Sequence, residues 1–193
     1  MKKLYFLVAV FLPVTFLHAQ LNKGQWIVGG NAGFSATSYN VSDVSHNTTR
    51  LQLTPGAGYF IMDKLAVGLK AVIYFNNQKD TYTGTPGSIT NSKVFSLGVS
   101  PFVRYYFLPK TNKINLLADA SYTYGTAKYT TKVEPYPSSS STSKQHAYTL
   151  AVGPAFFINH NVALEVTASY QVMNYEPDTQ NIFMINAGFQ IHL

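Results

Sequence analysis

The stretch KVFSLGVSPFVRYYFLPKTNKINLLADASYTY, Lys93–Tyr124, contains two runs in which every second residue is apolar. Before the turn sequence LPKTNK the apolar series is Phe95, Leu97, Val99, Pro101, Val103, Tyr105 and Phe107. After the turn it is Ile114, Leu116, Ala118, Ala120, Tyr122 and Tyr124. Successive side chains of a strand point to opposite faces, so the pattern predicts two amphipathic strands. Each is about as long as a tilted strand that crosses a bilayer, roughly 9–11 residues plus interfacial ends.

The rest of the chain repeats this pattern and gives eight strands in total. The other alternating runs cover residues 24–36, 50–61, 65–76, 147–158, 162–172 and 182–193. The connections are short turns at 62–64, 108–113 and 159–161, long polar loops at 37–49, 77–92 and 125–145, and a shorter loop at 174–180. The sequence therefore predicts an all-β fold, an eight-stranded antiparallel up-and-down transmembrane β-barrel with its long loops at one end. The serine-rich run Ser138–Ser143 predicts a loop tip without regular structure.

The first 19 residues have the organisation of a secretory signal. Lys2 and Lys3 precede an apolar segment at 4–17, and Leu17-His18-Ala19 predicts cleavage before Gln20. We therefore expect a cleaved signal peptide at 1–19 and one barrel domain at 20–193. The chain contains no cysteine, which excludes a disulfide framework and an N-terminal lipid anchor on cysteine.

The composition favours β-structure and argues against a nucleic-acid-binding protein. Charged residues make up 11% and aromatic residues 15% of the chain, and glutamate is scarce. The lysines and arginines are scattered, whereas nucleic-acid binding needs a clustered basic patch.

The apolar face of the strands could in principle point inward, as in a secreted soluble barrel of the lipocalin kind. Three features favour lipid outside instead. No charged residue falls in the apolar registers, and the opposite face is rich in glycine and other small residues that suit a narrow barrel interior. Aromatic residues also gather near both ends of the apolar face, as in the two interfacial belts of membrane barrels. They are Phe34, Phe75, Phe95, Tyr124, Tyr148, Tyr170 and Phe183 near the loops, and Trp26, Tyr59, Tyr105, Phe107, Phe156 and Phe189 near the turns.

With this architecture, residues 24–193 resemble the small eight-stranded outer-membrane barrels of the OmpA/OmpX type, in the broad outer membrane β-barrel domain family. The resemblance implies a location in the outer membrane of a Gram-negative bacterium, contact with its lipid and lipopolysaccharide, and insertion by the outer-membrane assembly machinery. Strands that this machinery recognises commonly end in phenylalanine, and here the alternating end Phe189–Leu193 closes on leucine instead. The fold hosts adhesins, structural barrels and lipid-modifying enzymes, so it does not by itself specify a function.

Five ionisable residues fall in the inward register. Lys70, Arg104, Asp119 and Glu165 lie in the half nearer the short turns, and Arg50 lies farther out. A charge in a narrow, poorly hydrated interior is costly unless it is paired. The first hypothesis is an ion-paired plug that closes the lumen, and the alternative is a narrow ion path lined by the same residues.

Catalytic, metal and cofactor sites are not expected. The histidines that follow the signal are His46 in a loop, His146 at a strand start, His160 in a turn and His192 at the last strand. None is combined with a serine and a carboxylate on the lipid face, as a lipid A-modifying enzyme would need. No ligand cluster has the spacing of a metal site.

The long loops provide the candidate contacts to an extracellular protein or glycan. These are Tyr82, Tyr129, Tyr136, Lys128 and Lys132, with Lys79 and Lys144 nearby. Loops on a rigid scaffold often carry function, although a hydrophilic surface without a dedicated partner is an equal alternative. The sequence thus predicts a monomeric, non-enzymatic barrel with a structural or adhesive role, and the alternatives are a narrow channel or a lipid A-modifying enzyme.

Overall fold

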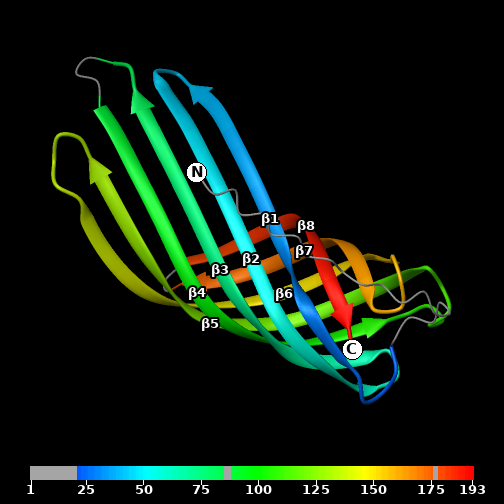
Figure 1. Ribbon diagram of the computed structural model, residues 1–193. Helices are drawn as coiled ribbons and strands as arrows, with labels where there is room; N and C mark the ends of the chain where they lie inside the picture. Colours follow the sequence, from blue (N-terminus) through cyan, green and yellow to red (C-terminus); the bar gives the residue numbers. More distant parts are fainter. Residues whose placement is uncertain (1–20, 85–87, 176–177) are drawn as a thin grey trace, which may run out of the picture.

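The protein is a closed barrel of eight antiparallel strands (Figure 1). The computed structural model describes residues 21–84, 88–175 and 178–193, so the predicted signal peptide lies outside the described residues. The strands are β1 (Trp26–Val41), β2 (Val44–Met62), β3 (Leu65–Tyr82), β4 (Ser88–Tyr106), β5 (Ile114–Val133), β6 (Ser139–Phe157), β7 (Val162–Tyr175) and β8 (Asp178–His192). Each strand pairs with the next, and β8 returns to β1. The predicted fold class is confirmed.

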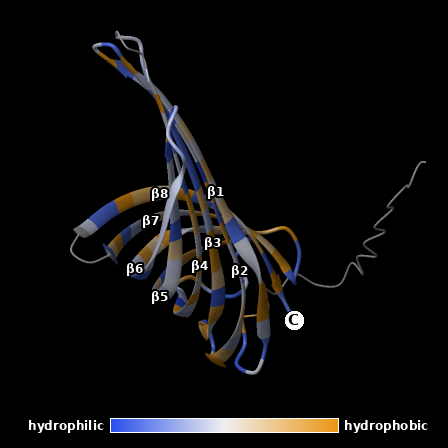
Figure 2. Cartoon of the chain, turned by 90° about the vertical axis from the view of Figure 1, so that its left-hand side faces the viewer, coloured by the Kyte–Doolittle hydropathy of each residue, from blue (hydrophilic) through white to orange (hydrophobic). Residues whose placement is uncertain are grey.

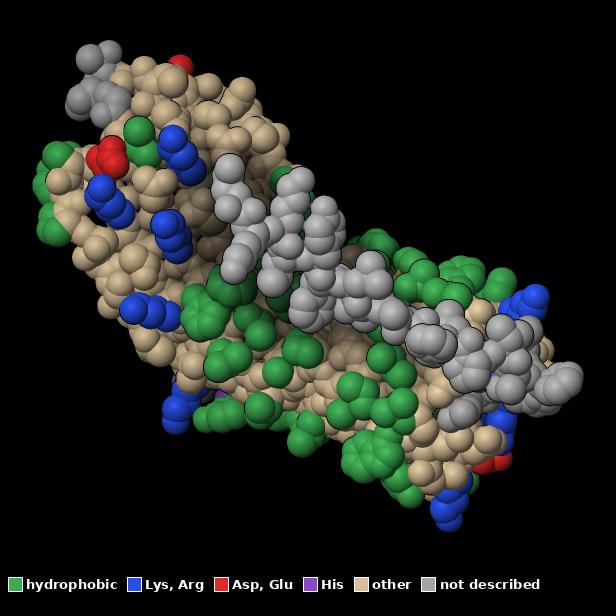
Figure 3. Space-filling view, in the orientation of Figure 1, with side chains coloured by type: hydrophobic (Ala, Val, Ile, Leu, Met, Phe, Trp, Pro, Cys, Tyr) green, Lys and Arg blue, Asp and Glu red, His purple; other side chains and the backbone are tan. Residues whose placement is uncertain are grey.

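The apolar registers point outward, as predicted. In β4, Phe95, Leu97 and Val99 are exposed while Ser96 and Ser100 are buried in the lumen. Hydrophobic and hydrophilic residues alternate along the strands (Figure 2), and apolar side chains form a band across the face of the barrel seen in Figure 3. Among the described residues, no helix is long and apolar enough to cross a membrane.

Aromatic side chains are in contact in both predicted belts. Near the short turns, the rings of Trp26 and Tyr59 lie 5.3 Å apart, and Tyr105 meets Phe107 at 5.1 Å. At the other end of the span, Phe75 and Phe95 on adjacent strands lie 5.1 Å apart. The pairs Trp26–Tyr59 and Phe75–Phe95 join neighbouring strands and stabilise them beyond the area that they bury.

The predicted short turns are confirmed, and their sequences explain them. The β2–β3 connection is Asp63-Lys64, with Lys64 in the left-handed region at φ 67°. In the β6–β7 turn, the Oδ1 atom of Asn159 accepts hydrogen bonds from the backbone N–H groups of Asn161 at 2.9 Å and Val162 at 2.8 Å. Such side-chain acceptance is why asparagine favours tight turns.

The long polar loops, in contrast, were predicted wrongly, because most of their residues continue the strands. β1 and β2 stay paired as far as Val41 and Val44, which leaves a two-residue turn at Ser42-Asp43. β5 and β6 stay paired out to Thr131 and Ser139, so all of the serine-rich run except Ser138 belongs to β6. Residues 77–82 and 88–92 likewise extend β3 and β4. Residues 37–49, 77–82, 88–92 and 125–145 together form what we call the outer β-wall.

The outer β-wall has a simple physical origin. Once the barrel holds two neighbouring strands side by side, each further pair of residues adds backbone hydrogen bonds without the entropy cost of closing a new loop. The Thr, Tyr and Val residues of these segments also favour extended backbone. Apolar alternation marks only the part of each strand that meets lipid, so it could not reveal this extension. In Figure 1 the hairpins of β1–β6 rise far beyond the β7–β8 hairpin.

The β1–β8 closure is shorter than the strands that it joins. Ile27–Ala32 of β1 pairs with Ala187–His192 of β8, and two backbone hydrogen bonds between Trp26 and Leu193 continue this ladder at the turn end. Beyond Ala32 the two strands run in different directions, β1 upward with the wall and β8 toward the β7 side (Figures 1 and 2). The barrel wall is therefore open along this seam in its outer half.

Candidate functional site

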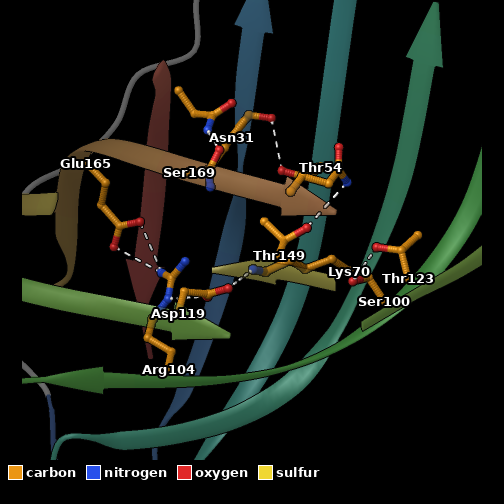
Figure 4. A network of polar contacts seen from close by, with 12 residues as sticks. Asn31, Thr54, Lys70, Ser100, Arg104, Asp119, Thr123, Thr149, Glu165 and Ser169 are labelled. Carbon is orange, nitrogen blue, oxygen red and sulfur yellow. Dashed lines mark hydrogen bonds and ion pairs between the residues drawn. The ribbon is translucent and has the colours of Figure 1, made fainter. Parts of the chain in front are cut away.

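Four of the five predicted inward charges meet in the lumen (Figure 4). Arg104 on β4 donates from Nε to Asp119 Oδ2 at 3.0 Å, and from Nη1 to Glu165 Oε1 at 3.0 Å and Oε2 at 3.1 Å. Lys70 on β3 donates from Nζ to Asp119 Oδ1 at 2.5 Å. Asp119 lies on β5 and Glu165 on β7, so these bonds link strands on different sides of the barrel. We call these four residues the lumen charge cluster.

The lumen charge cluster is almost fully enclosed and carries two positive and two negative charges. Arg104 is 2% and Glu165 1% exposed. Phe102 lies beneath both cations, with its ring centre 4.5 Å from Lys70 Nζ and 5.8 Å from Arg104 Cζ. Opposite charges with satisfied hydrogen bonds, together with an aromatic face, offset the cost of removing each ion from water.

Tyr106 completes the lumen charge cluster and was missed in the sequence. Its hydroxyl donates to Glu165 Oε1 at 3.1 Å and lies 3.4 Å from Nε2 of His192. The signal was present, because Tyr106 follows Arg104 by two places and so occupies the same face of β4.

An apolar floor closes the lumen between the lumen charge cluster and the short turns. Its buried residues are Leu21, Ile27, Phe60, Ala66, Tyr106, Leu117, Ala155, Phe157 and Ala163. The ring of His192 lies among these aromatic side chains, 5.3 Å from Phe157 and 6.0 Å from Phe60. The floor residues on the strands alternate with the lipid-facing side chains, but the alternation does not show that they form one layer across the barrel.

The segment before β1 is tied to the turns around this floor. The backbone N–H of Lys64 donates to the carbonyl of Leu21, and that of Lys23 donates to Asp63 Oδ1, both at 2.9 Å. Lys110 Nζ lies 2.5 Å from Asp63 Oδ2 and 2.5 Å from Asn22 Oδ1. The hydrogen bonds from Lys110 and Lys23 lower the pKa of Asp63 below its ordinary value of 3.8.

The outer half of the lumen is filled mainly by hydroxyl and amide side chains. Thr123 donates to Ser100 Oγ at 3.0 Å, Asn186 Nδ2 donates to Ser169 Oγ at 2.9 Å, and Gln145 bonds Ser96. A cavity of only about 50 Å³ remains among these residues.

Arg50, the fifth predicted charge, is separate from the lumen charge cluster. It is exposed near the outer mouth of the lumen, where it interacts with Tyr74 of β3. Together with Gln52 these residues line a cleft of about 430 Å³ beside the open β1–β8 seam.

The histidines have defined partners. His46, predicted to be in a loop, lies within β2 with Nδ1 2.8 Å from Asp80 Oδ1, and its ring stacks on Tyr39 at 4.7 Å. His146 Nδ1 lies 2.6 Å from the hydroxyl of Tyr122. Within residues 21–84, 88–175 and 178–193, no group of three or more His, Cys, Asp or Glu residues could hold a metal ion.

Most of the predicted loop contacts lie on strands. Tyr82 ends β3, and Lys128, Tyr129 and Lys132 belong to β5, while Tyr136 is in the β5–β6 turn and is 67% exposed. Lys132 Nζ lies 3.3 Å from Glu134 Oε1.

Lysines gather on one side of the outer β-wall. Five of them are exposed and occupy the same register as the lipid-facing side chains, namely Lys79, Lys93, Lys128, Lys132 and Lys144. We call this set the lysine face. Lys128 pairs across strands with Phe95, and Lys93 lies two places beyond Phe95. Figure 3 shows basic side chains beyond the hydrophobic band at this end. The lysine face therefore begins where the outer aromatic belt ends.

The comparisons with known proteins agree with this geometry. The sequence model of the family described as "Outer membrane protein beta-barrel domain" matches residues 5–192. The chain belongs to this family. Its place is therefore the bacterial outer membrane, where barrels of this kind have short turns on the periplasmic side. No curated protein matches the chain in sequence.

Solved structures show the same fold. Neisserial surface protein A (NspA) is 16% identical, with a TM-score of 0.51 and coverage of 88% of this chain and 97% of that one. The outer membrane protein OprG from Pseudomonas aeruginosa is 15% identical, with a TM-score of 0.51 and coverage of 91% and 99%. At these identities the likeness concerns the fold alone.

Proposed function

We propose that the protein is a non-enzymatic surface barrel with a closed lumen, and that its outer β-wall binds anionic groups of the surrounding lipopolysaccharide. The role is structural and adhesive. The observation that carries this proposal is the lysine face, which points sideways from the wall just beyond the outer aromatic belt.

The position of the lysine face suits phosphate at the membrane surface. A belt of aromatic rings lies at the interface of a membrane, so side chains immediately beyond it are at the level of the lipid head groups. Lys93 and Lys128 are at this level, since both are next to Phe95 or within two places of it. Lysine is a point charge that binds phosphate without a fixed geometry, and this suits a mobile lipid better than a rigid ligand.

The charges add to one another. Lys93, Lys128 and Lys144 lie on adjacent strands and have no carboxylate across from them in the ladder. Lys93 pairs with Asn77 and Thr130, Lys128 pairs with Phe95 and Thr142, and Lys144 pairs with Thr126. Basic residues near an anionic membrane surface contribute about 1 kcal/mol each. Together the three would contribute about 3 kcal/mol, which corresponds to roughly a hundredfold in affinity.

The filled lumen gives less support to the alternative function, a channel for ions or small solutes. The lumen charge cluster and the apolar floor fill the turn-side half, and hydrogen-bonded hydroxyl and amide groups occupy the outer half. An eight-stranded barrel is only just wide enough for its own side chains, so a plugged interior is the expected state.

A lipopolysaccharide-binding assay on three charge-neutral substitutions tests the proposal. The variant Lys93→Gln/Lys128→Gln/Lys144→Gln should bind purified lipopolysaccharide on the order of a hundredfold more weakly than the unchanged protein at low salt. The difference should shrink as ionic strength rises.

The matched control is Lys23→Gln/Lys64→Gln/Lys113→Gln, which removes three lysines at the periplasmic end. This variant should bind as the unchanged protein does. Equal losses in both triple variants would show that overall charge, rather than the lysine face, governs binding, and the proposal would then be rejected.

A further inference from the structure

The open β1–β8 seam forms a cleft that neither the lysine face nor the lumen charge cluster explains. Its volume is about 430 Å³, within the range of about 300–1,000 Å³ that is typical of small-molecule sites. It is lined by β1 residues 33–35, β8 residues 180–185, and Arg50, Gln52 and Tyr74 from β2 and β3. We call it the seam cleft.

The seam cleft has an apolar side and a polar side. On the lipid side, Phe34 and Phe183 are 70% and 68% exposed, more than any other large hydrophobic residue in the part of the chain that the structure describes, because the strands that carry them part here. On the lumen side, Ile182 and Met184 give β8 an apolar inner surface, whereas neighbouring inner positions carry hydroxyl or amide groups. Across the cleft is the guanidinium of Arg50.

Arg50 makes the polar end of the seam cleft suitable for an anion. No carboxylate is among the residues that line the cleft, and the carboxylates of the lumen charge cluster are already bonded to Lys70 and Arg104. Arginine presents several donors to a carboxylate or phosphate and is weakly hydrated, so it binds such groups well at a partly enclosed site.

We propose that the seam cleft binds a single-chain amphiphile with an anionic head group, such as a long-chain fatty acid. The head group bonds Arg50 beside Tyr74, and the acyl chain runs along Ile182 and Met184 and leaves between Phe34 and Phe183 toward the outer leaflet. The gap between β1 and β8 joins the lumen mouth to the lipid at this level, so such a molecule can enter sideways from the membrane. This proposal does not rest on the lysine face.

An amphiphile with an anionic head group fits the seam cleft better than a second copy of this protein whose edge strand pairs with β1. Strand pairing would satisfy the free backbone groups of β1 beyond Ala32, but it would leave Arg50 and the apolar inner surface of β8 unused. An uncharged lipid chain would cover Phe34 and Phe183, but it would leave the guanidinium of Arg50 without an anionic partner.

The test uses the whole protein in phosphatidylcholine nanodiscs and a dansyl-labelled undecanoic acid, with the methyl ester of this probe as the uncharged comparison. The acid should bind saturably, and the ester at least tenfold more weakly. Arg50→Gln should weaken the acid at least tenfold and leave the ester unchanged. The control variant Lys93→Gln, which removes a cation outside the cleft, should leave both affinities unchanged.

A second measurement places the chain in the seam cleft. Because the protein has no cysteine, Met184→Cys introduces a single thiol on the inner surface of β8. Laurate should slow its reaction with a maleimide several-fold, and the neutral detergent dodecyl maltoside should not.

The proposal is wrong if the acid does not bind, if Arg50→Gln binds it as tightly as the unchanged protein does, or if laurate leaves the thiol equally reactive. Crosslinking of two copies through β1, with no probe bound, would assign the seam to self-association instead. Heat-modifiable gel mobility establishes that each variant is folded, so lost binding is not mistaken for a lost barrel.

Discussion

Arg104 joins the two sides of the lumen charge cluster, because both carboxylates of the cluster bond to it. Arg104→Met would leave Glu165 buried without a cation and Asp119 with Lys70 alone. Breaking a buried ion pair by removing one partner costs about 3–5 kcal/mol. We expect this loss in the free energy of unfolding, measured by urea titration in lipid vesicles.

The double variant Arg104→Met/Glu165→Gln provides the control for this prediction. It retains the neutral pair of Lys70 and Asp119, so it should be more stable than Arg104→Met alone by about 1 kcal/mol or more. If the second substitution instead adds to the loss, Glu165 is stabilised by contacts other than Arg104.

Asp63 gives a prediction in acid at the periplasmic end. Its pKa is below 3.8 in the folded protein, chiefly because Lys110 donates a hydrogen bond to it. The ionised Asp63 carboxylate therefore stabilises the attachment of the segment before β1 in full above pH 3.8. This stabilisation is lost as the pH falls through the lower pKa of Asp63 in the folded protein.

Trypsin cleavage after Lys23 is not possible in strong acid, so hydrogen exchange at the Lys23 amide is the suitable readout. The amide should become less protected as pH falls below 3.8, after correction for the intrinsic exchange rate. In Asp63→Asn protection should not change over this range, and equal pH dependence in both proteins would exclude Asp63 as the cause.

Individual residues of the lumen were predictable only as far as the register of the strands determines them. Lys70, Arg104, Asp119 and Glu165 were assigned to one half of the interior from their places along the strands, and they meet there. Their partner atoms depend on strand tilt and on the choice of rotamers across the barrel, which a single strand does not specify. For the same reason the cleft beside Arg50 could not be foreseen.

Among the elements, the β5–β6 hairpin gives the clearest test of the outer β-wall. Ala127 and Ser143 are paired, so residues 128–142 can be replaced by a two-residue Asn-Gly turn without changing the register below. The barrel should remain folded, with a midpoint of thermal unfolding within a few degrees of the unchanged protein, because the lipid-facing span and the lumen charge cluster are untouched.

Binding to lipopolysaccharide should weaken in this shortened protein, since Lys128 and Lys132 are removed. The matched control shortens the β1–β2 hairpin, joining Thr37 to Thr48 through Asn-Gly, and removes no lysine. Equal binding by the two shortened proteins would contradict a role for the lysine face.

The strands were predictable wherever they meet lipid and not beyond. Alternation of apolar residues located every membrane-spanning segment, because a lipid-facing position excludes polar side chains. Segments such as Thr37–Thr49 face water on both sides, so selection for apolar residues is absent and the strand leaves no pattern. These segments are strands only because the backbone hydrogen bonds between the two neighbouring strands continue through them.

For the whole molecule, the filled lumen predicts that the barrel does not conduct ions. Purified protein in a planar bilayer should give no steady conductance above that of the bare membrane, because the lumen charge cluster and the apolar floor occupy the passage. Steady, voltage-independent openings would refute the plug and favour the ion path. Arg104→Ala/Glu165→Ala should remain silent as well, since the apolar floor that includes Phe60 and Phe157 still closes the periplasmic end.

The short closure between β1 and β8 also decides how the barrel yields to mechanical force. Seven residue pairs, Trp26–Ala32 against Ala187–Leu193, hold the two edges together, while every other neighbouring pair of strands is joined along a longer ladder. If the C-terminus is pulled from the periplasmic side, the few backbone hydrogen bonds between β1 and β8 break one after another, starting at the turn end. The β1–β8 edge should therefore separate first, before the ten-pair β6–β7 ladder and the Arg104–Glu165 ion pair that hold β7 in the barrel.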